Sequence, residues 1–291
     1  MARPLRLELP GSVYYLSGLG NGGHQVFRTP EDPALFLEIL GECCERFDWR
    51  CFAYCLLPDR YHLVVETRRA TLARGMRQLN GRFTQASNRR HGVGGHLLQG
   101  RYRAVMVESP GFLAAVCRDV LRQPVERGLA AEAVAWRWSS LRALAGRLPA
   151  GRPAPAWLAV DRVLALYDRE PARAREKLLA AVAAEGQPSV WEALRHQVFL
   201  GSEAFVAEMR ERARAAAAGR GSLLEIPRAQ WQAPPPPLEV FAAEAADREE
   251  AMARAYLSGG YSQASIARHF QVHYSTVSRA VRRFEQRAPA S

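Results

Sequence analysis

Hydroxyl and arginine side chains recur along one face of an expected helix near the end of the sequence. Residues 274–284 place Val277, Ala280, Val281 and Phe284 at i, i+3, i+4 and i+7, which indicates one buried apolar face. The opposite face then carries Ser275, Thr276, Arg279, Arg282 and Arg283. Such groups contact phosphates and base edges when a helix enters the major groove of DNA. The alternative is a solvated basic helix that binds nothing.

A second helix must hold this face in position. We expect it over Ser262–Phe270, with Ile266, Ala267 and Phe270 facing inward, and we expect the groove-entering helix over Tyr274–Phe284. The turn between them is Gln271-Val272-His273, where Val272 fills the space between the helices. This arrangement resembles the helix-turn-helix of resolvases and many bacterial regulators. A glycine often begins the turn in those motifs, whereas this sequence has Gln271.

A second set of arginines is predicted in and after a helix in the first half of the chain. It consists of Arg77, Arg82, Arg89, Arg90, Arg101 and Arg103. The aromatic residues Phe83 and Tyr102 lie among them. Arginines on phosphates and bases stacked on rings would suit a folded single strand. A solvated charged face is the alternative.

The elements that carry this second set follow a strand-and-helix order within residues 1–148. Strands are predicted at Ser12–Ser17, Trp49–Leu56, Tyr61–Glu66 and Tyr102–Val107, and helices at Pro30–Phe47, Thr71–Arg90 and Pro110–Arg122. The order βαββαβ followed by a helix is that of the ferredoxin-like, split-βαβ fold. We therefore predict an α+β domain whose antiparallel sheet has helices on one face and leaves the other open to a ligand.

The rest of the chain is predicted to be helical. Residues 149–232 are read as an all-α region, with helices at Asp161–Tyr167, Ala172–Glu185, Ser189–Leu200 and Ser202–Ala218. Residues 233–240 contain Pro234–Pro237, which predicts a stiff linker because each proline fixes its own φ. Residues 241–291 are then the helix-turn-helix domain.

Composition supports a nucleic-acid partner. Forty Lys plus Arg against 29 Asp plus Glu leave a net charge of +11, and nearly all the cations are arginines, whose planar fork grips phosphate. A GC-rich genome would explain the choice of arginine but not the net excess. Five cysteines without paired zinc-type spacing indicate reduced thiols. With no signal peptide or membrane-length apolar run, a cytoplasmic, nucleoid-associated protein is expected.

Three ordered blocks of the first domain resemble the REP-associated tyrosine transposases, which are single-strand transposases of the HUH type. The blocks are MARPLRLELPGSVYYLSGLGN at the start, GMRQLNGRFTQASNRRHGVGGHLLQGRYRAV over residues 75–105, and WRWSSLRA over residues 136–143. They cover about half the chain, with a weaker echo in VWEALRHQVFLGSEAF. The resemblance implies a metal held by two strand histidines and a polar helix residue, and a helical tyrosine that forms a 5′-phosphotyrosine link with DNA.

The sequence departs from this pattern at the positions that would do the chemistry. The histidine pair falls on Arg60-Tyr61-His62, and an arginine has no lone pair to give a metal. The tyrosine position is Asp119, and the family's arginine near the N-terminus is Leu19. The resemblance therefore implies a transposase scaffold that no longer performs the reaction in the family's way, and no catalytic residue is assigned.

Two arrangements of the altered site remain open. Asp119 and Gln123 lie four apart on one helix face, and with His62 they would hold Mg²⁺ or Mn²⁺. The favoured alternative is a salt bridge from Asp119 to Arg60. Core packing is favoured over a nucleophilic role for Tyr61 and Tyr102. His91 and His96 are expected to be surface or phosphate-contact residues rather than metal ligands.

Three functions follow from these observations. The leading hypothesis is a DNA-binding protein that recognises a single-stranded hairpin or repeat with its first domain and duplex with its last. The second is an active, metal-dependent single-strand transposase or nuclease with a displaced nucleophile. The third, an RNA-binding module, is disfavoured by the helix-turn-helix. No membrane contact is expected, and a homodimer stays open.

Overall fold

A computed structural model describes residues 8–218, 236–258, 261 and 263–287. These residues form two compact units, one up to Met209 and the other from Arg210 on. Each unit has its own hydrophobic core. None of the described helices combines the length and the apolar character that a membrane crossing requires.

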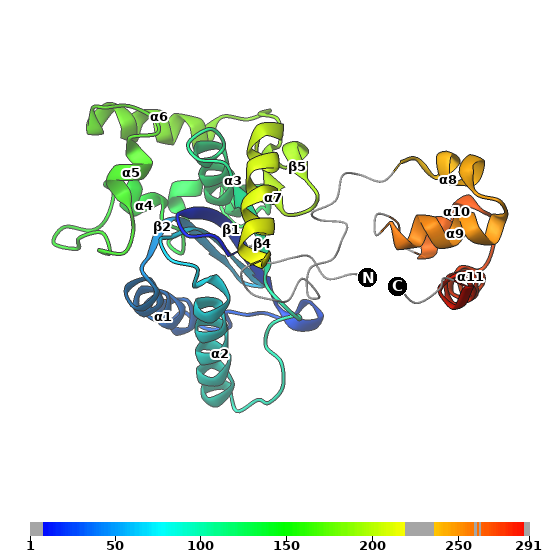
Figure 1. Cartoon of the computed structure of the whole chain (residues 1–291). Helices are drawn as coiled ribbons and strands as arrows, with labels where there is room; N and C mark the ends of the chain where they lie inside the picture. The colour runs from blue at the N-terminus through cyan, green and yellow to red at the C-terminus, as the bar shows by residue number, and fades with distance from the viewer. Residues whose placement is uncertain (1–7, 219–235, 259–260, 262, 288–291) are drawn as a thin grey trace. The chain divides into compact units, whose positions relative to one another are not determined.

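The first unit is built on an antiparallel sheet of four strands with the predicted βαββαβ order. The strands are β1 (Ser12–Leu19), β2 (Trp49–Leu57), β3 (Arg60–Thr67) and β4 (Arg103–Val107), and the two crossover helices are α1 (Glu31–Phe47) and α2 (Leu72–His91). Their order across the sheet is β2-β3-β1-β4, which is the ferredoxin-like arrangement. Figure 1 shows α1 and α2 together on one side of the sheet.

The other face of the sheet is covered, so the prediction of an open face is wrong. Helix α3 (Leu113–Glu126) packs against β2 and β3 on this side. Helix α5 (Val160–Leu164) also packs against β2, and α6 (Pro171–Ala183) packs against α3. The short helix α4 (Leu141–Leu144) begins within the tryptophan block of residues 136–143. The region after residue 149 thus extends the first core, because its apolar side chains pack against β2 and α3.

The middle region also contributes strands, which its all-α prediction lacks. The segment predicted as a helix at Ser189–Leu200 forms a 3-10 turn (Val190–Ala193) and two strands, β5 (Leu194–Arg195) and β6 (Phe199–Leu200). Strand β6 pairs in parallel with β4, and His196 and Gln197 turn the chain with positive φ. The free edge of β4 therefore overrides the local helical preference. Helix α7 (Glu203–Ala218) follows as predicted.

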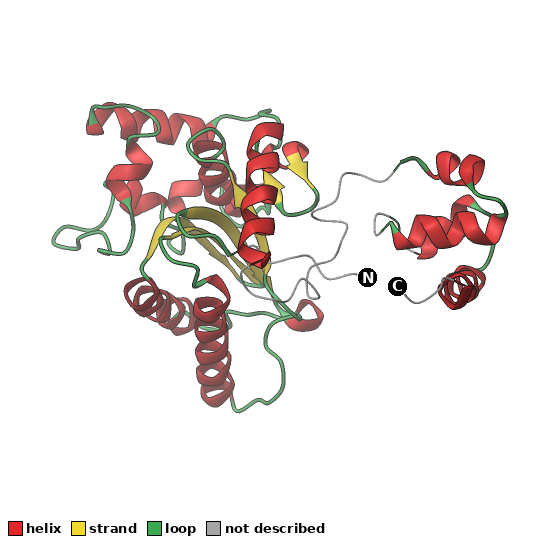
Figure 2. Cartoon of the chain, in the orientation of Figure 1, coloured by secondary structure: helices red, strands yellow, loops and turns green. Residues whose placement is uncertain are grey.

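The second unit is entirely helical over its described residues (Figure 2). Besides the end of α7 from Arg210 on, it contains α8 (Leu238–Glu244), α9 (Arg248–Leu257), α10 (Gln263–His269) and α11 (Tyr274–Arg287). Ile266, Ala267, Phe270, Val277 and Val281 lie in its core, as predicted. Residues 219–232, part of the predicted linker and Ser262 lie outside the described residues.

Candidate functional site

The site that the resemblance implies centres on His62, and the surroundings of His62 follow from strand pairing. Side chains alternate along β3, so Arg60 and His62 share one face and Tyr61 lies on the other. His62 pairs with Ser17 of β1, and Ser17 in turn pairs with Arg103 of β4. His62, Ser17 and Arg103 therefore form one row across the sheet.

A buried hydrogen bond joins His62 to a tyrosine that the sequence analysis did not select. The Nδ1 atom of His62 lies 2.7 Å from the hydroxyl of Tyr15. His62 is 6% exposed and Tyr15 5% exposed. Burial, together with the charges of Arg60 and Arg127, lowers the pKa of His62 to about 3. Burial likewise raises the pKa of the Tyr15 phenol. At neutral pH both groups are therefore uncharged.

Asp119 is bound by Trp191 instead of by Arg60, so the favoured salt bridge is wrong. The indole Nε1 of Trp191 donates to Asp119 Oδ2 at 2.9 Å, and burial raises the pKa of this carboxyl. The Trp191 ring also meets the Tyr15 ring at a centroid distance of 4.5 Å. Arg60 pairs with its neighbour Asp59 at 2.7 Å. Trp191 belongs to the weak sequence echo after residue 190, the one signal that pointed to it.

The structure does not bring the three candidate metal ligands together around one cavity. Gln123 donates to Glu126 at 2.8 Å, and it lines a cavity of about 310 Å³ with Asp119 and Trp191. His62 does not line that cavity. Across the described residues, no group of three His, Cys, Asp or Glu side chains is placed to hold a metal ion. The nearest charges to His62 include two guanidinium groups, which repel a cation.

The two tyrosines considered from the sequence, Tyr61 and Tyr102, are packing residues, as expected. Tyr61 is fully buried, donates its hydroxyl proton to Asn80 at 2.8 Å and packs against Phe36 of α1. Tyr102 packs against the same core. Because Tyr61 lies on the opposite face of β3, its hydroxyl points away from His62.

The arginines of α2 and the following loop divide into two groups. Arg82 is paired with Glu42 of α1, and Arg90 is paired with the buried Asp32 at 3.1 Å. Arg77 and Arg101 instead flank a groove of about 470 Å³, and Arg89 is exposed. The groove is also lined by polar groups of Asn80, Thr84, Gln85 and His96.

His91 differs from His96 in its surroundings. Its Nε2 lies 2.9 Å from Asp32 Oδ2 and its side chain is 14% exposed, so the expectation of a surface residue is wrong for His91. Asp32 also accepts the backbone N–H groups of Arg28 and Thr29. Together these contacts tie the start of α1 to the end of α2.

The helix-turn-helix has the predicted form, and two further helices, α8 and α9, share its core. Helices α9 and α11 pack against each other, and α10 joins the same core. Gln271, at the position where a glycine is common, has a φ of +49°. Arg279 and Arg283 are exposed on α11, and Ser275 and Thr276 are half-buried at its start; the side chain of Arg282 lies outside the described residues. Arg283 is paired with Glu249 of α9 at 2.9 Å.

Three comparisons with known proteins bear on these sites. A family model described as a helix-turn-helix domain matches residues 248–290. The comparison with curated proteins gives no match. Among solved structures, one described as a REP-associated tyrosine transposase bound to a REP hairpin is similar, with a TM-score of 0.44 and 16% identity over 53% of this chain and 92% of that chain. The C-terminal unit is therefore a helix-turn-helix domain.

Proposed function

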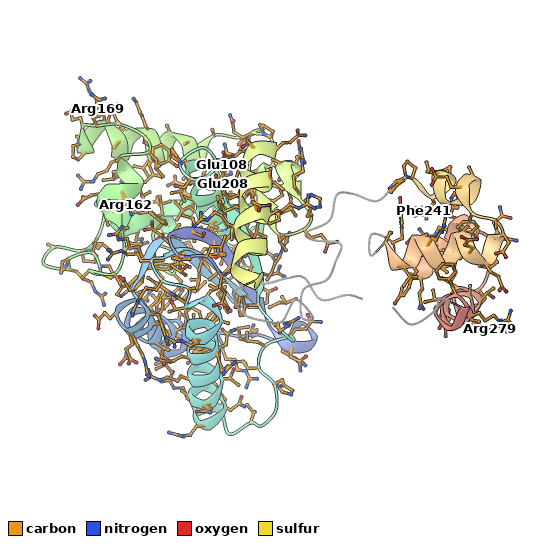
Figure 3. All side chains as sticks on the ribbon, in the orientation of Figure 1. Glu108, Arg162, Arg169, Glu208, Phe241 and Arg279 are labelled. Atoms are coloured by element: carbon orange, nitrogen blue, oxygen red, sulfur yellow. The ribbon has the colours of Figure 1, made fainter. Side chains whose placement is uncertain are left out.

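We propose that this protein binds DNA, with α11 entering the major groove of a duplex. The exposed side of α11 is the observation that carries this proposal. Val277, Ala280 and Val281 are buried, so Arg279 projects from the opposite side, as Figure 3 shows. Tyr274 is 58% exposed at the start of the same helix, where recognition helices contact base edges.

The first unit is proposed to bind a single-stranded hairpin or repeat along the groove beside α2. Arg77 and Arg101 would hold phosphates there, while Asn80 and Gln85 offer amides to unpaired bases. The resemblance to REP-associated tyrosine transposases supports a hairpin as the partner. We take the protein to be a binder without strand-transfer activity, because Asp119 stands at the tyrosine position and Tyr15 is buried.

Duplex binding is tested by mobility shift at fixed salt with Arg279→Ala. Removing a base or phosphate contact is expected to weaken binding about 5- to 100-fold. Arg248→Ala is the matched control, since it removes one exposed arginine from the start of α9. Equal affinities for the Arg279→Ala variant and the unmutated protein would remove α11 from the interface.

Loss of catalysis is tested with labelled hairpin DNA and Mn²⁺ on a denaturing gel. The unmutated protein is expected to shift the hairpin under native conditions and to leave it uncut and unattached under denaturing ones. A double variant with Arg60→His and Asp119→Tyr, run beside it, asks whether the family residues restore cleavage. A covalent adduct with the unmutated protein would show an active enzyme with a displaced nucleophile.

A further inference from the structure

The row that contains His62 is surrounded by positive charge. Arg60 lies on the same face of β3, and Arg103 lies across Ser17 on β4. Arg127, just beyond α3, and Arg60 are both close enough for their charges to act on His62, and Arg60 and Arg103 act in the same way on Tyr15. Three guanidinium groups therefore converge on the Tyr15–His62 pair.

The acidic groups nearby do not cancel this charge. Asp59 is shared by Arg60 at 2.7 Å and Arg127 at 3.8 Å, and Asp119 is bound to Trp191. Arg103 lies 5.5 Å from the Trp191 ring and has no ion-pair partner among the described residues. Its N–H donors are thus available to a ligand.

The hydrogen bond from Tyr15 determines what His62 can offer. A phenol proton is far more acidic than the N–H of a neutral imidazole, so the Tyr15 hydroxyl donates and Nδ1 accepts. The ring proton must then lie on Nε2. This atom is buried and has no hydrogen-bond partner within the described part of the chain. An N–H group cannot ligate a metal ion, but it can donate to an oxygen anion.

We propose that the cluster of arginines around His62 is a phosphate-binding site that works without a divalent metal, in which Arg60, Arg103 and Arg127 hold a DNA phosphate and His62 Nε2 donates to one of its oxygens. The guanidinium groups supply the positive charge that a metal would otherwise bring, and their planar forks match two phosphate oxygens at once. This inference rests on the proposed function, because it adds a phosphate contact to the same DNA-binding unit.

The first test measures hairpin binding in EDTA and in Mn²⁺. Equal affinities in the two solutions are expected, and a requirement for Mn²⁺ would overturn the proposal. Arg103→Ala is expected to weaken binding about tenfold. It should also reduce the salt slope, the slope of log affinity against log salt concentration, by about 0.7, which is the value for one phosphate contact on a single strand. Arg169→Ala, at an exposed position on the first unit, is the matched control for loss of charge (Figure 3).

Arg103→Lys separates the effect of charge from that of geometry, and it serves as a control in case Arg103→Ala fails to fold. It should keep most of the salt slope and lose part of the affinity, because lysine has no planar fork. Hairpin affinity unchanged in both Arg103→Ala and Arg127→Ala would overturn this site and leave the proposed function standing.

The second test does not depend on hairpin binding. With ¹⁵N-labelled histidine, the Nε2 signal of His62 should shift on addition of a short single-stranded oligonucleotide in EDTA, and the shift should disappear in Arg103→Ala. Inorganic phosphate in a parallel titration distinguishes a site for any phosphate from one that requires a phosphodiester. No His62 shift with either ligand would overturn the proposal, even if the helix-turn-helix still binds duplex.

Discussion

At the scale of single residues, protein partners decide which arginines remain for DNA. Arg82 and Arg90 are held by Glu42 and Asp32, so using them for phosphate would first break an ion pair. Arg60 shares the single carboxylate of Asp59 with Arg127, so this pair keeps an excess positive charge. Arg77 and Arg101 have no ion-pair partner among the described residues and flank the groove beside α2. The sequence shows that all six are arginines, but their partners come from helices and loops far along the chain.

Arg77→Ala with Arg101→Ala is therefore expected to weaken hairpin binding more than Arg82→Ala does. Removing one phosphate contact should lower the salt slope by about 0.7, so the double variant should lower it by about 1.4. Arg82→Ala removes the same kind of charge from the same helix, but its guanidinium is already bound to Glu42. Salt titrations of hairpin affinity measure the difference. Equal slopes for the two variants would place the strand elsewhere.

Asp32 has a structural role that should appear as a pH dependence. Burial alone would raise the pKa of Asp32, but the N–H groups of Thr29 and Arg28 and the bond to His91 outweigh it and lower the pKa. A lowered carboxyl pKa adds stability above the unfolded pKa of about 3.9 and loses it as the pH falls through the folded pKa.

Asp32→Asn should thus destabilise the first unit by about 2 kcal/mol at pH 7, the value of hydrogen bonds to a charged group. The difference in free energy of unfolding between the variant and the unmutated protein should become smaller below about pH 4. Urea unfolding at pH 7, 5 and 3 measures it, with the exposed Asp161→Asn as control. A gap that stays constant down to pH 3 would exclude the ionised carboxylate as its cause.

At the scale of elements, local patterns predicted those parts of the fold that local patterns determine. Alternating strands and amphipathic helices gave the βαββαβ order and the inward faces of α10 and α11. The region Ser189–Leu200 was predicted wrongly, because its pairing with β4 involves residues more than 90 positions away. The roles of Trp191 and Tyr15 are also non-local, because their partners Asp119 and His62 lie 72 and 47 positions away in the sequence.

The turn of the helix-turn-helix allows an element-scale prediction. Gln271 has a φ of +49°, a left-handed conformation that costs a residue with a Cβ atom roughly 1 kcal/mol. Gln271→Gly should stabilise the second unit by about 0.5–1 kcal/mol after the greater freedom of glycine when unfolded is included. Gln271→Ala keeps the Cβ atom and should bring no gain. Thermal unfolding measures the stability of both variants. Equal changes in stability for Gln271→Gly and Gln271→Ala would exclude backbone strain at this position as the cause.

At the scale of the whole molecule, the chain combines two cores that share no buried cluster. The first includes Val64 at the centre of the sheet, and the second includes Val277 on α11. A ligand stabilises only the folded unit that binds it. Duplex and hairpin DNA should therefore act on different unfolding transitions of one chain, if each unit binds the DNA proposed for it.

Calorimetry of the full chain should resolve two transitions. Val277→Ala and Val64→Ala each remove a fully buried side chain and should cost about 2 kcal/mol, each lowering one transition only. These variants identify which transition belongs to which unit. Duplex DNA should then raise the midpoint of the transition that Val277→Ala lowers, and hairpin DNA that of the other. If both DNAs raised the same transition, one unit would bind both, and the division of labour between the units would be wrong.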